Sequence, residues 1–255
     1  MQNKRMAQRI EGEAEELAAS GWRLANQDRY VLVFALVMVT ILANALPAQS
    51  AFGMTMFAMS LTLTLVVTLV TSDSGRIRTV ATGGMITLLF VVTLVAQALG
   101  DRVLSIVCFK IATVATCLVI PSVIGRRIIK HPKVSLNTVA GAADIYLLFG
   151  LLFAVAYSLV GDVVLHWYPS LVANAGPTTT AAQAFFLSAR VPQPSDFVYY
   201  SFVTLTTVGY GDLTASTGIG RMLSVVEALV GQLYLVTVVA VLVSNMTMGR
   251  TPAKG

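Results

Sequence analysis

The sequence predicts an all-α membrane protein with six transmembrane helices and a short re-entrant helix before the sixth. Two observations carry this prediction. Hydrophobic residues make up 56% of the 255 residues and charged residues only 11%, against roughly 25% charged in ordinary soluble proteins. The apolar residues also gather in six runs of about the length that a helix needs to cross the hydrocarbon core. Because backbone groups find no water there, each run is expected to be helical.

The six predicted spans are uninterrupted apolar runs, separated by polar or charged stretches. They cover residues 30–46, 51–71, 80–99, 103–125, 139–160 and 222–243. The first span is the shortest, and it ends before Pro47, which cannot continue a helix.

Basic residues set the predicted orientation. Thirteen of the seventeen lie before the first span, after the second, after the fourth or after the sixth: Lys4, Arg5, Arg9, Arg23, Arg29, Arg76, Arg78, Arg126, Arg127, Lys130, Lys133, Arg250 and Lys254. The positive-inside rule makes that side cytoplasmic. The protein is therefore expected in the plasma or inner membrane, with both termini in the cytoplasm. These charges form no continuous basic stripe, so nucleic acid is not an expected partner.

The spans divide the chain into five predicted parts. These are an N-terminal cytoplasmic segment (1–29), a four-helix domain (30–125), a cytoplasmic linker (126–138), a domain built on the last two spans (139–245) and a short cytoplasmic tail (246–255). The apolar residues of the first part have loosely helical spacing, which favours an amphipathic interfacial helix. A tetramerising bundle and a disordered segment are the alternatives.

The segment between the last two spans carries the most specific signal in the chain. Residues 161–196 are polar to mixed and predict a long extracellular turret, in which 181–187 are expected to form a short surface helix. An aromatic-rich stretch follows over 197–205, and residues 206–212 then read Thr-Thr-Val-Gly-Tyr-Gly-Asp.

This seven-residue string resembles the selectivity filter of the potassium channel superfamily. The resemblance covers residues 139–245 closely, whereas the first four spans are similar to the six-transmembrane, one-pore-loop, prokaryote-type architecture only in number and orientation. It implies a passive, potassium-selective channel in the lipid bilayer, with K⁺ in the filter and no other cofactor. The residues that it assigns to K⁺ binding are Thr207, Val208, Gly209, Tyr210 and Gly211.

The chemistry of the string agrees with that role. A backbone carbonyl is dipolar but uncharged, so it can replace the water around a potassium ion without trapping the ion. Stacking successive carbonyls requires alternating backbone hand, and Gly209 and Gly211 adopt positive φ at little steric cost. One loop supplies a quarter of such a ring, which predicts a homotetramer. The preceding residues, 197–206, are expected to form a short helix whose carboxyl end faces the cation.

Flanking residues are assigned to filter support by the same resemblance. These are Thr206, Asp212, Val203, Tyr199 and Tyr200, and Tyr200 is expected to donate a hydrogen bond to Asp212. Interface packing of the two tyrosines is the alternative.

Glu227 lies inside the sixth span, where an ionisable side chain is costly and usually has a partner. It is expected to support the filter from behind by bonding Ser201 or Thr204. Lining the ion path is the alternative.

The rest of the sixth span supplies candidates for gating. Gly231 lies nineteen residues after Asp212, which is the spacing of the superfamily's hinge glycine. A small residue that permits close helix contact is the alternative. The positions expected to line the cavity and the gate are Gln232, Leu235, Val239 and Val243.

The fourth predicted span lacks the regular basic residues of a voltage sensor. Only Lys110 lies within it, with Arg102 at one edge and Arg126 and Arg127 at the other. Steep gating takes three or four charges per subunit. Weak or absent voltage dependence is therefore expected, with Lys110 reaching the interface or pairing with an acid.

Three other functions compete with this reading. A non-selective cation channel would carry a filter change such as an acid in place of Tyr210, and a potassium transporter subunit would carry four degenerate loops. A scaffold with a vestigial filter is disfavoured by the intact Thr207 and both glycines. No enzyme is expected, because His131 and His166 fall in separate loops without nucleophile or metal-ligand spacing.

Overall fold

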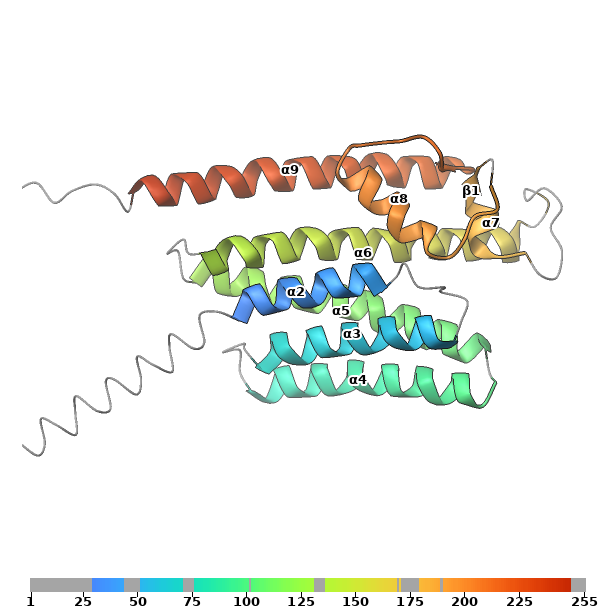
Figure 1. The fold of residues 1–255 in the computed structure, drawn as a ribbon, viewed down its shortest axis with the longest axis horizontal. Coiled ribbons are helices and arrows are strands. Elements are labelled where there is room, and N and C mark those ends of the chain that lie inside the picture. Colours follow the sequence, from blue (N-terminus) through green and yellow to red (C-terminus); the bar gives the residue numbers. More distant parts are fainter. Residues whose placement is uncertain are drawn as a thin grey trace, which may run out of the picture.

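The computed structural model describes residues 29–43, 51–70, 76–100, 102–130, 136–168, 170, 179–188 and 190–248. Over these residues the chain forms eight helices and one two-stranded ladder (Figure 1). The helices are α2 (Arg29–Ala43), α3 (Ala51–Val70), α4 (Arg76–Ala98), α5 (Arg102–Lys130), α6 (Leu136–Trp167), α7 (Ala181–Phe185), α8 (Asp196–Leu205) and α9 (Gly218–Met248). The ladder pairs β1 (Phe186–Leu187) antiparallel to β2 (Thr214–Ala215). The predicted N-terminal amphipathic helix and most of the predicted tail lie outside the described residues.

All six predicted spans fall on apolar helices. Three helices are long and apolar enough to cross a membrane, over Leu104–Arg126, Thr138–Trp167 and Gly218–Val241. The other three predicted spans coincide with shorter apolar stretches of the described chain: Tyr30–Ala43, Met59–Leu69 and Gly83–Ala98. The chain is therefore a helical membrane protein.

Several helices extend beyond the predicted boundaries. Helix α5 continues to Lys130 and α6 begins at Leu136, so the predicted 126–138 linker narrows to the residues between them. Helix α6 also continues to Trp167, into the predicted turret. Each residue added to an existing helix gains a backbone hydrogen bond, so helices readily propagate past an apolar run. The predicted 181–187 surface helix is shorter than expected, because it ends at Phe185, where the ladder begins.

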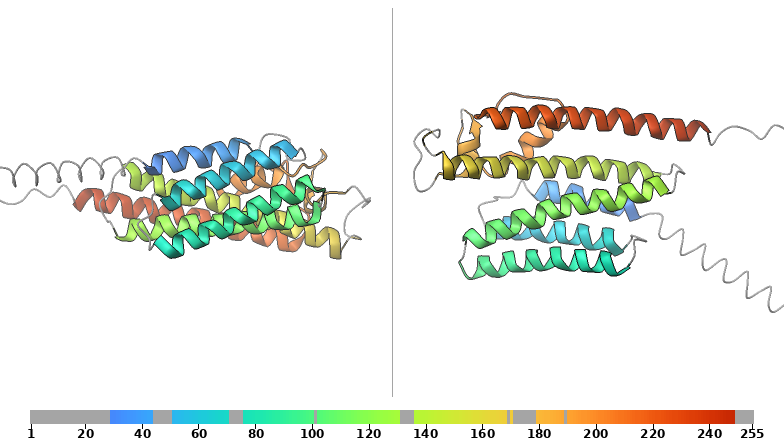
Figure 2. Two further views of the ribbon diagram at one scale, coloured as in Figure 1. Left: turned by 90° about the horizontal axis from the view of Figure 1, so that it is seen from below. Right: turned by 180° about the vertical axis from the view of Figure 1, so that it is seen from behind.

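Helix α6 is the central element of the fold. Helices α2 and α5 pack against it on one side, and α8 and α9 pack against it on the other (Figures 1 and 2). Helices α3 and α4 lie beyond α2 and α5 (Figure 1). The core between α6 and the four-helix unit is aliphatic, and its fully buried members include Val33, Val37, Ile120, Ile124 and Leu148. The four-helix unit, which consists of α2 to α5, thus packs against α6 of the same chain.

An ion pair reinforces this contact between α5 and α6. Lys110 Nζ pairs with a carboxylate oxygen of Asp162. A charged side chain within an apolar span is costly unless it has a partner. The pairing of Lys110 with an acid, which was one of the two sequence-based expectations, is confirmed.

Asp144 of α6 is buried without such a partner. Its exposed fraction is 0%, and neither carboxylate oxygen has a hydrogen-bond partner within the described part of the chain. Leaving a buried polar group unsatisfied costs about 1–3 kcal/mol. The buried, unsatisfied carboxyl group of Asp144 therefore lowers the stability of the fold.

Replacing Asp144 with leucine, a side chain of similar size, is expected to stabilise the protein. The substitution removes an unsatisfied acid and should raise the free energy of unfolding by about 1–3 kcal/mol. Thermal unfolding of the purified protein in detergent would measure this as an increase in Tm. The matched control is Asp162→Leu, which removes a paired acid and should lower Tm. An unchanged or lower Tm for Asp144→Leu would contradict the prediction.

Candidate functional site

Helix α8 ends directly before the 206–212 segment and holds its beginning. It begins and ends within one residue of the predicted 197–206 helix and packs against both long helices. The backbone N–H groups of Val208 and Gly209 both donate to the Val203 carbonyl oxygen, at 3.0 and 3.3 Å. The Thr206 hydroxyl donates to the Phe202 carbonyl oxygen at 2.6 Å. The end of α8 thus fixes where the segment begins.

The segment has left-handed backbone conformations at every second residue from Thr207 to Gly211. Its φ angles are 59° at Thr207, 55° at Gly209 and 79° at Gly211. The positive φ expected at both glycines is confirmed. An added Cβ at either glycine meets no atom within 4 Å, so backbone conformation rather than crowding calls for glycine. The value at Thr207 was not predicted, because a β-branched residue rarely adopts positive φ.

The same segment is open on the surface of the single chain. All seven residues from Thr206 to Asp212 are exposed, with Tyr210 at 71%. The loop that contains them lies at the edge of the molecule opposite α3 and α4 (Figure 1). Non-helical backbone is tolerated at membrane depth only where protein covers it or where it lines a water-filled path. In a membrane, one chain alone leaves this site incomplete.

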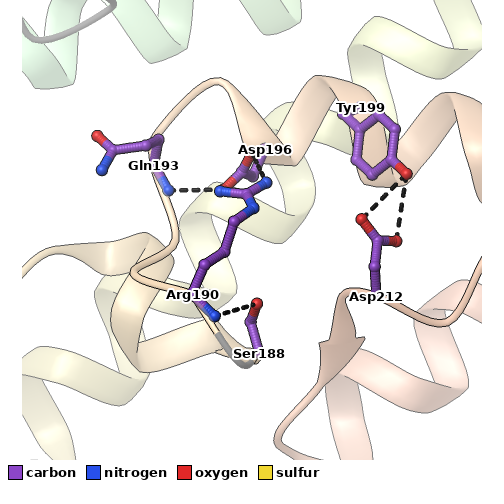
Figure 3. A network of polar contacts seen from close by, with 6 residues as sticks. All are labelled: Ser188, Arg190, Gln193, Asp196, Tyr199 and Asp212. Carbon is purple, nitrogen blue, oxygen red and sulfur yellow. Dashed lines mark hydrogen bonds and ion pairs between the residues drawn. The ribbon is translucent and has the colours of Figure 1, made fainter.

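Tyr199, rather than Tyr200, contacts Asp212. The Tyr199 hydroxyl lies 3.2 and 3.1 Å from the two carboxylate oxygens of Asp212 (Figure 3), and its ring stacks on Tyr210. Desolvation raises the pKa of the Tyr199 hydroxyl and the bond to Asp212 raises it further, so the group remains a donor.

The predicted Tyr200–Asp212 bond is therefore wrong. Successive residues of a helix point about 100° apart, so only one of two adjacent tyrosines can face the segment. Tyr200 turns toward α9, where its hydroxyl lies 2.8 Å from Ser224 Oγ.

A charged pair anchors the beginning of α8. The Arg190 guanidinium makes two bonds, of 2.8 and 2.7 Å, to the two carboxylate oxygens of Asp196 (Figure 3). One of these oxygens also accepts the Gln193 backbone N–H at 2.6 Å. The hydrogen bonds to Asp196 raise the pKa of Arg190. Sequence analysis did not find this pair, because the conformation of the intervening prolines decides whether the two charges meet.

Glu227 joins three helices behind the segment. Its carboxyl group, on α9, bonds the hydroxyls of Ser201 on α8 and Tyr157 on α6. Ser201 was one of the two predicted partners and is confirmed; Thr204 was the other, and the site takes Tyr157 instead. A tyrosine buried within an apolar helix usually needs a hydrogen-bond partner, which was the available signal for Tyr157.

Aromatic rings fill the space around this contact. Phe185 and Phe186 pack edge to face with their centroids 4.8 Å apart, and Tyr157 and Tyr200 do so at 5.1 Å. Phe197 at the start of α8 completes the cluster. These rings bring α6, α7, β1 and α8 into one rigid support beside the segment.

Gly231 lies where α9 crosses the end of α8. Helix α9 is unbroken through this position. A Cβ built on Gly231 would lie 2.7 Å from Leu205 Cδ1 and 2.8 Å from the Leu205 carbonyl oxygen. Close helix contact therefore accounts for the glycine, and its role as a hinge stays a prediction.

The predicted cavity residues lie further along α9. Gln232, Leu235 and Val239 are all exposed in the single chain, and the side chain of Val243 is not among those described. Their role in lining a cavity or gate stays a prediction.

The apolar helices, the short helix between two of them and the open segment that follows define a pore-forming membrane protein. Comparison with known families agrees, because residues 178–248 match the family described as Ion channel. These residues run from just before α7 to the end of α9 and form an ion channel pore domain. No curated protein and no solved structure matched the chain. The prediction that the protein is a channel and not an enzyme is confirmed by the family match.

Tyr199→Phe is expected to weaken the outer end of the 206–212 segment. The change removes the hydroxyl that donates to the Asp212 carboxylate, and hydrogen bonds to a charged group are stronger than those between neutral groups. Currents should decay faster during sustained activity than in the unmodified channel. The matched control, Tyr200→Phe, removes the bond to Ser224 and should leave this decay close to that of the unmodified channel. Equal decay in both variants would contradict the assignment of Tyr199.

Proposed function

We propose that the chain is one subunit of a homotetrameric, potassium-selective channel that passes K⁺ passively down its electrochemical gradient. The observation that carries the proposal is the open 206–212 segment. It combines the full Thr-Thr-Val-Gly-Tyr-Gly-Asp string with positive φ at alternate residues, Thr207, Gly209 and Gly211. Such alternation turns successive carbonyl groups toward one side of the chain.

The carbonyl oxygens of Thr207, Val208, Gly209 and Tyr210, with the Thr207 hydroxyl, would bind K⁺. Four copies of the segment would surround the ion with oxygens that replace its water. Gly211 would let the chain turn away at the outer end. The carboxyl end of α8 would direct its partial negative charge toward a cation below the filter.

The surface of α9 supports assembly around an axis. Large apolar side chains are exposed along its length in the single chain: Ile219, Met222, Val225, Val226, Leu229, Leu233, Val236, Val239 and Val241. Part of this surface faces lipid in any arrangement. The neighbouring exposed filter backbone cannot face lipid, however, so other copies of the chain must enclose that side.

The proposal also includes the topology, the gating and the voltage dependence that the sequence predicts. Six spans place both termini in the cytoplasm of the cell. Gly231 bends α9 during gating, and Val239 and Val243 close the inner end by excluding water. Voltage dependence is weak, because Lys110 is the one basic residue within the apolar part of α5 and is paired with Asp162.

Single-channel recording with ion substitution tests the proposal. Purified protein in a planar bilayer is expected to give a reversal potential that follows the K⁺ gradient and ignores the Na⁺ gradient. Open probability should change little across a voltage ramp. A reversal potential near zero with K⁺ on one side and Na⁺ on the other would instead identify a non-selective cation channel. More than about two gating charges per subunit would overturn the weak voltage dependence.

Gly209→Ala is expected to abolish K⁺ flux into liposomes. An L-residue held in the left-handed region costs about 1–2 kcal/mol, and a tetramer would bear this cost four times at one level of the filter. The matched control is Gly218→Ala at the start of α9. Gly218 also has open space around it but is not among the positive-φ glycines, so its variant should keep the flux. Flux through Gly209→Ala at the unmodified rate would rule out the filter assignment.

A further inference from the structure

The carboxyl group of Glu227 lies fully enclosed where α6, α8 and α9 meet. Glu227, Tyr157 and Ser201 each have an exposed fraction of 0%. The Tyr157 hydroxyl bonds Oε2 of Glu227, and the Ser201 hydroxyl bonds Oε1. Each of these three helices thus contributes one polar side chain to a single buried contact.

No cation accompanies this acid in the described part of the chain. The ion pairs found there are Lys110–Asp162 and Arg190–Asp196, and neither includes Glu227. The titratable groups around Glu227 are phenols: Tyr157 bonds it, Tyr146 of α6 interacts with it electrostatically, and the Tyr200 ring of α8 packs on Tyr157. The nearest basic residue along α9, Arg221, is exposed, and its Nε donates to the Ala215 carbonyl oxygen. An ionised carboxylate buried without a cation is strongly disfavoured.

A count of the hydrogens leads to the same result. The Ser201 hydroxyl has one hydrogen to donate. Its Oγ lies 2.6 Å from the Gly150 carbonyl oxygen and also contacts Glu227 Oε1. A carbonyl oxygen and an ionised carboxylate are both acceptors, so they would compete for that hydrogen. With a proton on Oε1, Glu227 donates to Ser201 and Ser201 donates to Gly150, while Tyr157 donates to Oε2.

We propose that Glu227 is held as a neutral carboxylic acid, and that its proton completes a chain of donors from Tyr157 through Glu227 and Ser201 to the α6 backbone. The acid is a positioning residue, because its hydrogen bonds go to Ser201 of α8 and Tyr157 of α6, so that it acts on the 206–212 segment through α8. In its neutral form it connects the three helices without placing a negative charge beside the path of the cations. This last consequence rests on the proposed function, whereas the protonation state itself does not.

Infrared spectroscopy of the full chain in lipid tests the protonation state. The chain contains five glutamates, Glu11, Glu13, Glu15, Glu16 and Glu227, so labelling glutamate with ¹³C separates their bands from those of every aspartate, including the buried Asp144. At neutral pH we expect a carboxylic-acid C=O band that shifts with the label and is lost in Glu227→Gln. If Glu227→Gln instead removes only carboxylate bands, the acid is ionised and the proposal is overturned.

Two variants provide an independent test. The glutamine of Glu227→Gln reproduces the neutral acid, since its NH₂ group can donate to Ser201 and its oxygen can accept from Tyr157. Its Tm in detergent should stay close to that of the unmodified protein. Glu227→Ala should lower Tm, because it leaves the buried Tyr157 hydroxyl without its acceptor and the buried Ser201 oxygen without its donor. A Tm for Glu227→Gln as low as that of Glu227→Ala would show that the negative charge is required and would overturn the proposal.

The two proposals can fail separately. Sodium permeation with the glutamic-acid band present would overturn potassium selectivity and leave the protonated acid standing. Potassium selectivity without that band would overturn the protonated acid alone.

Discussion

The structure depends on one constraint, which is that polar backbone groups inside a membrane must have partners. Helices meet it internally. The 206–212 segment is not helical and all its residues are exposed, although the Val208 and Gly209 N–H groups bond the end of α8. Within a membrane, such a segment is stable only if other chains enclose it and if water or cations occupy the space that it faces. In the proposed channel, oligomeric assembly and ion passage therefore both follow from this exposed backbone.

Contacts at three points along α8 hold the 206–212 segment in place. Arg190 bonds Asp196 at the beginning of the helix, Glu227 bonds Ser201 at its middle, and the Val203 carbonyl oxygen accepts two N–H groups near its end. The aromatic cluster of α6, α7 and β1 fills the space beside them. Since each contact comes from a different part of the chain, a short helix of ten residues acquires a rigidity that it would not have alone.

Helix α6 separates the four-helix unit from the pore. Helices α2 and α5 contact one side of it, and α8 and α9 contact the other (Figure 2). The Lys110–Asp162 pair links α5 to α6. Among the described helices, α6 packs extensively against both the four-helix unit and the helices beside the 206–212 segment. Its Tyr157 hydroxyl and Gly150 carbonyl oxygen both belong to the Glu227 contact.

The sequence alone determined the helical membrane class, the place of the short helix and the positive φ of Gly209 and Gly211. Apolar length and the absence of a side chain are local properties, so they can be deduced without knowing the neighbours. Only the tertiary structure decided that Tyr199 rather than Tyr200 contacts Asp212, that Arg190 reaches Asp196, and that Tyr157 joins Ser201 at Glu227. Those partners depend on the rotation of α8 about its axis and on contacts between residues far apart in the chain. Packing sets both, and no local pattern encodes them.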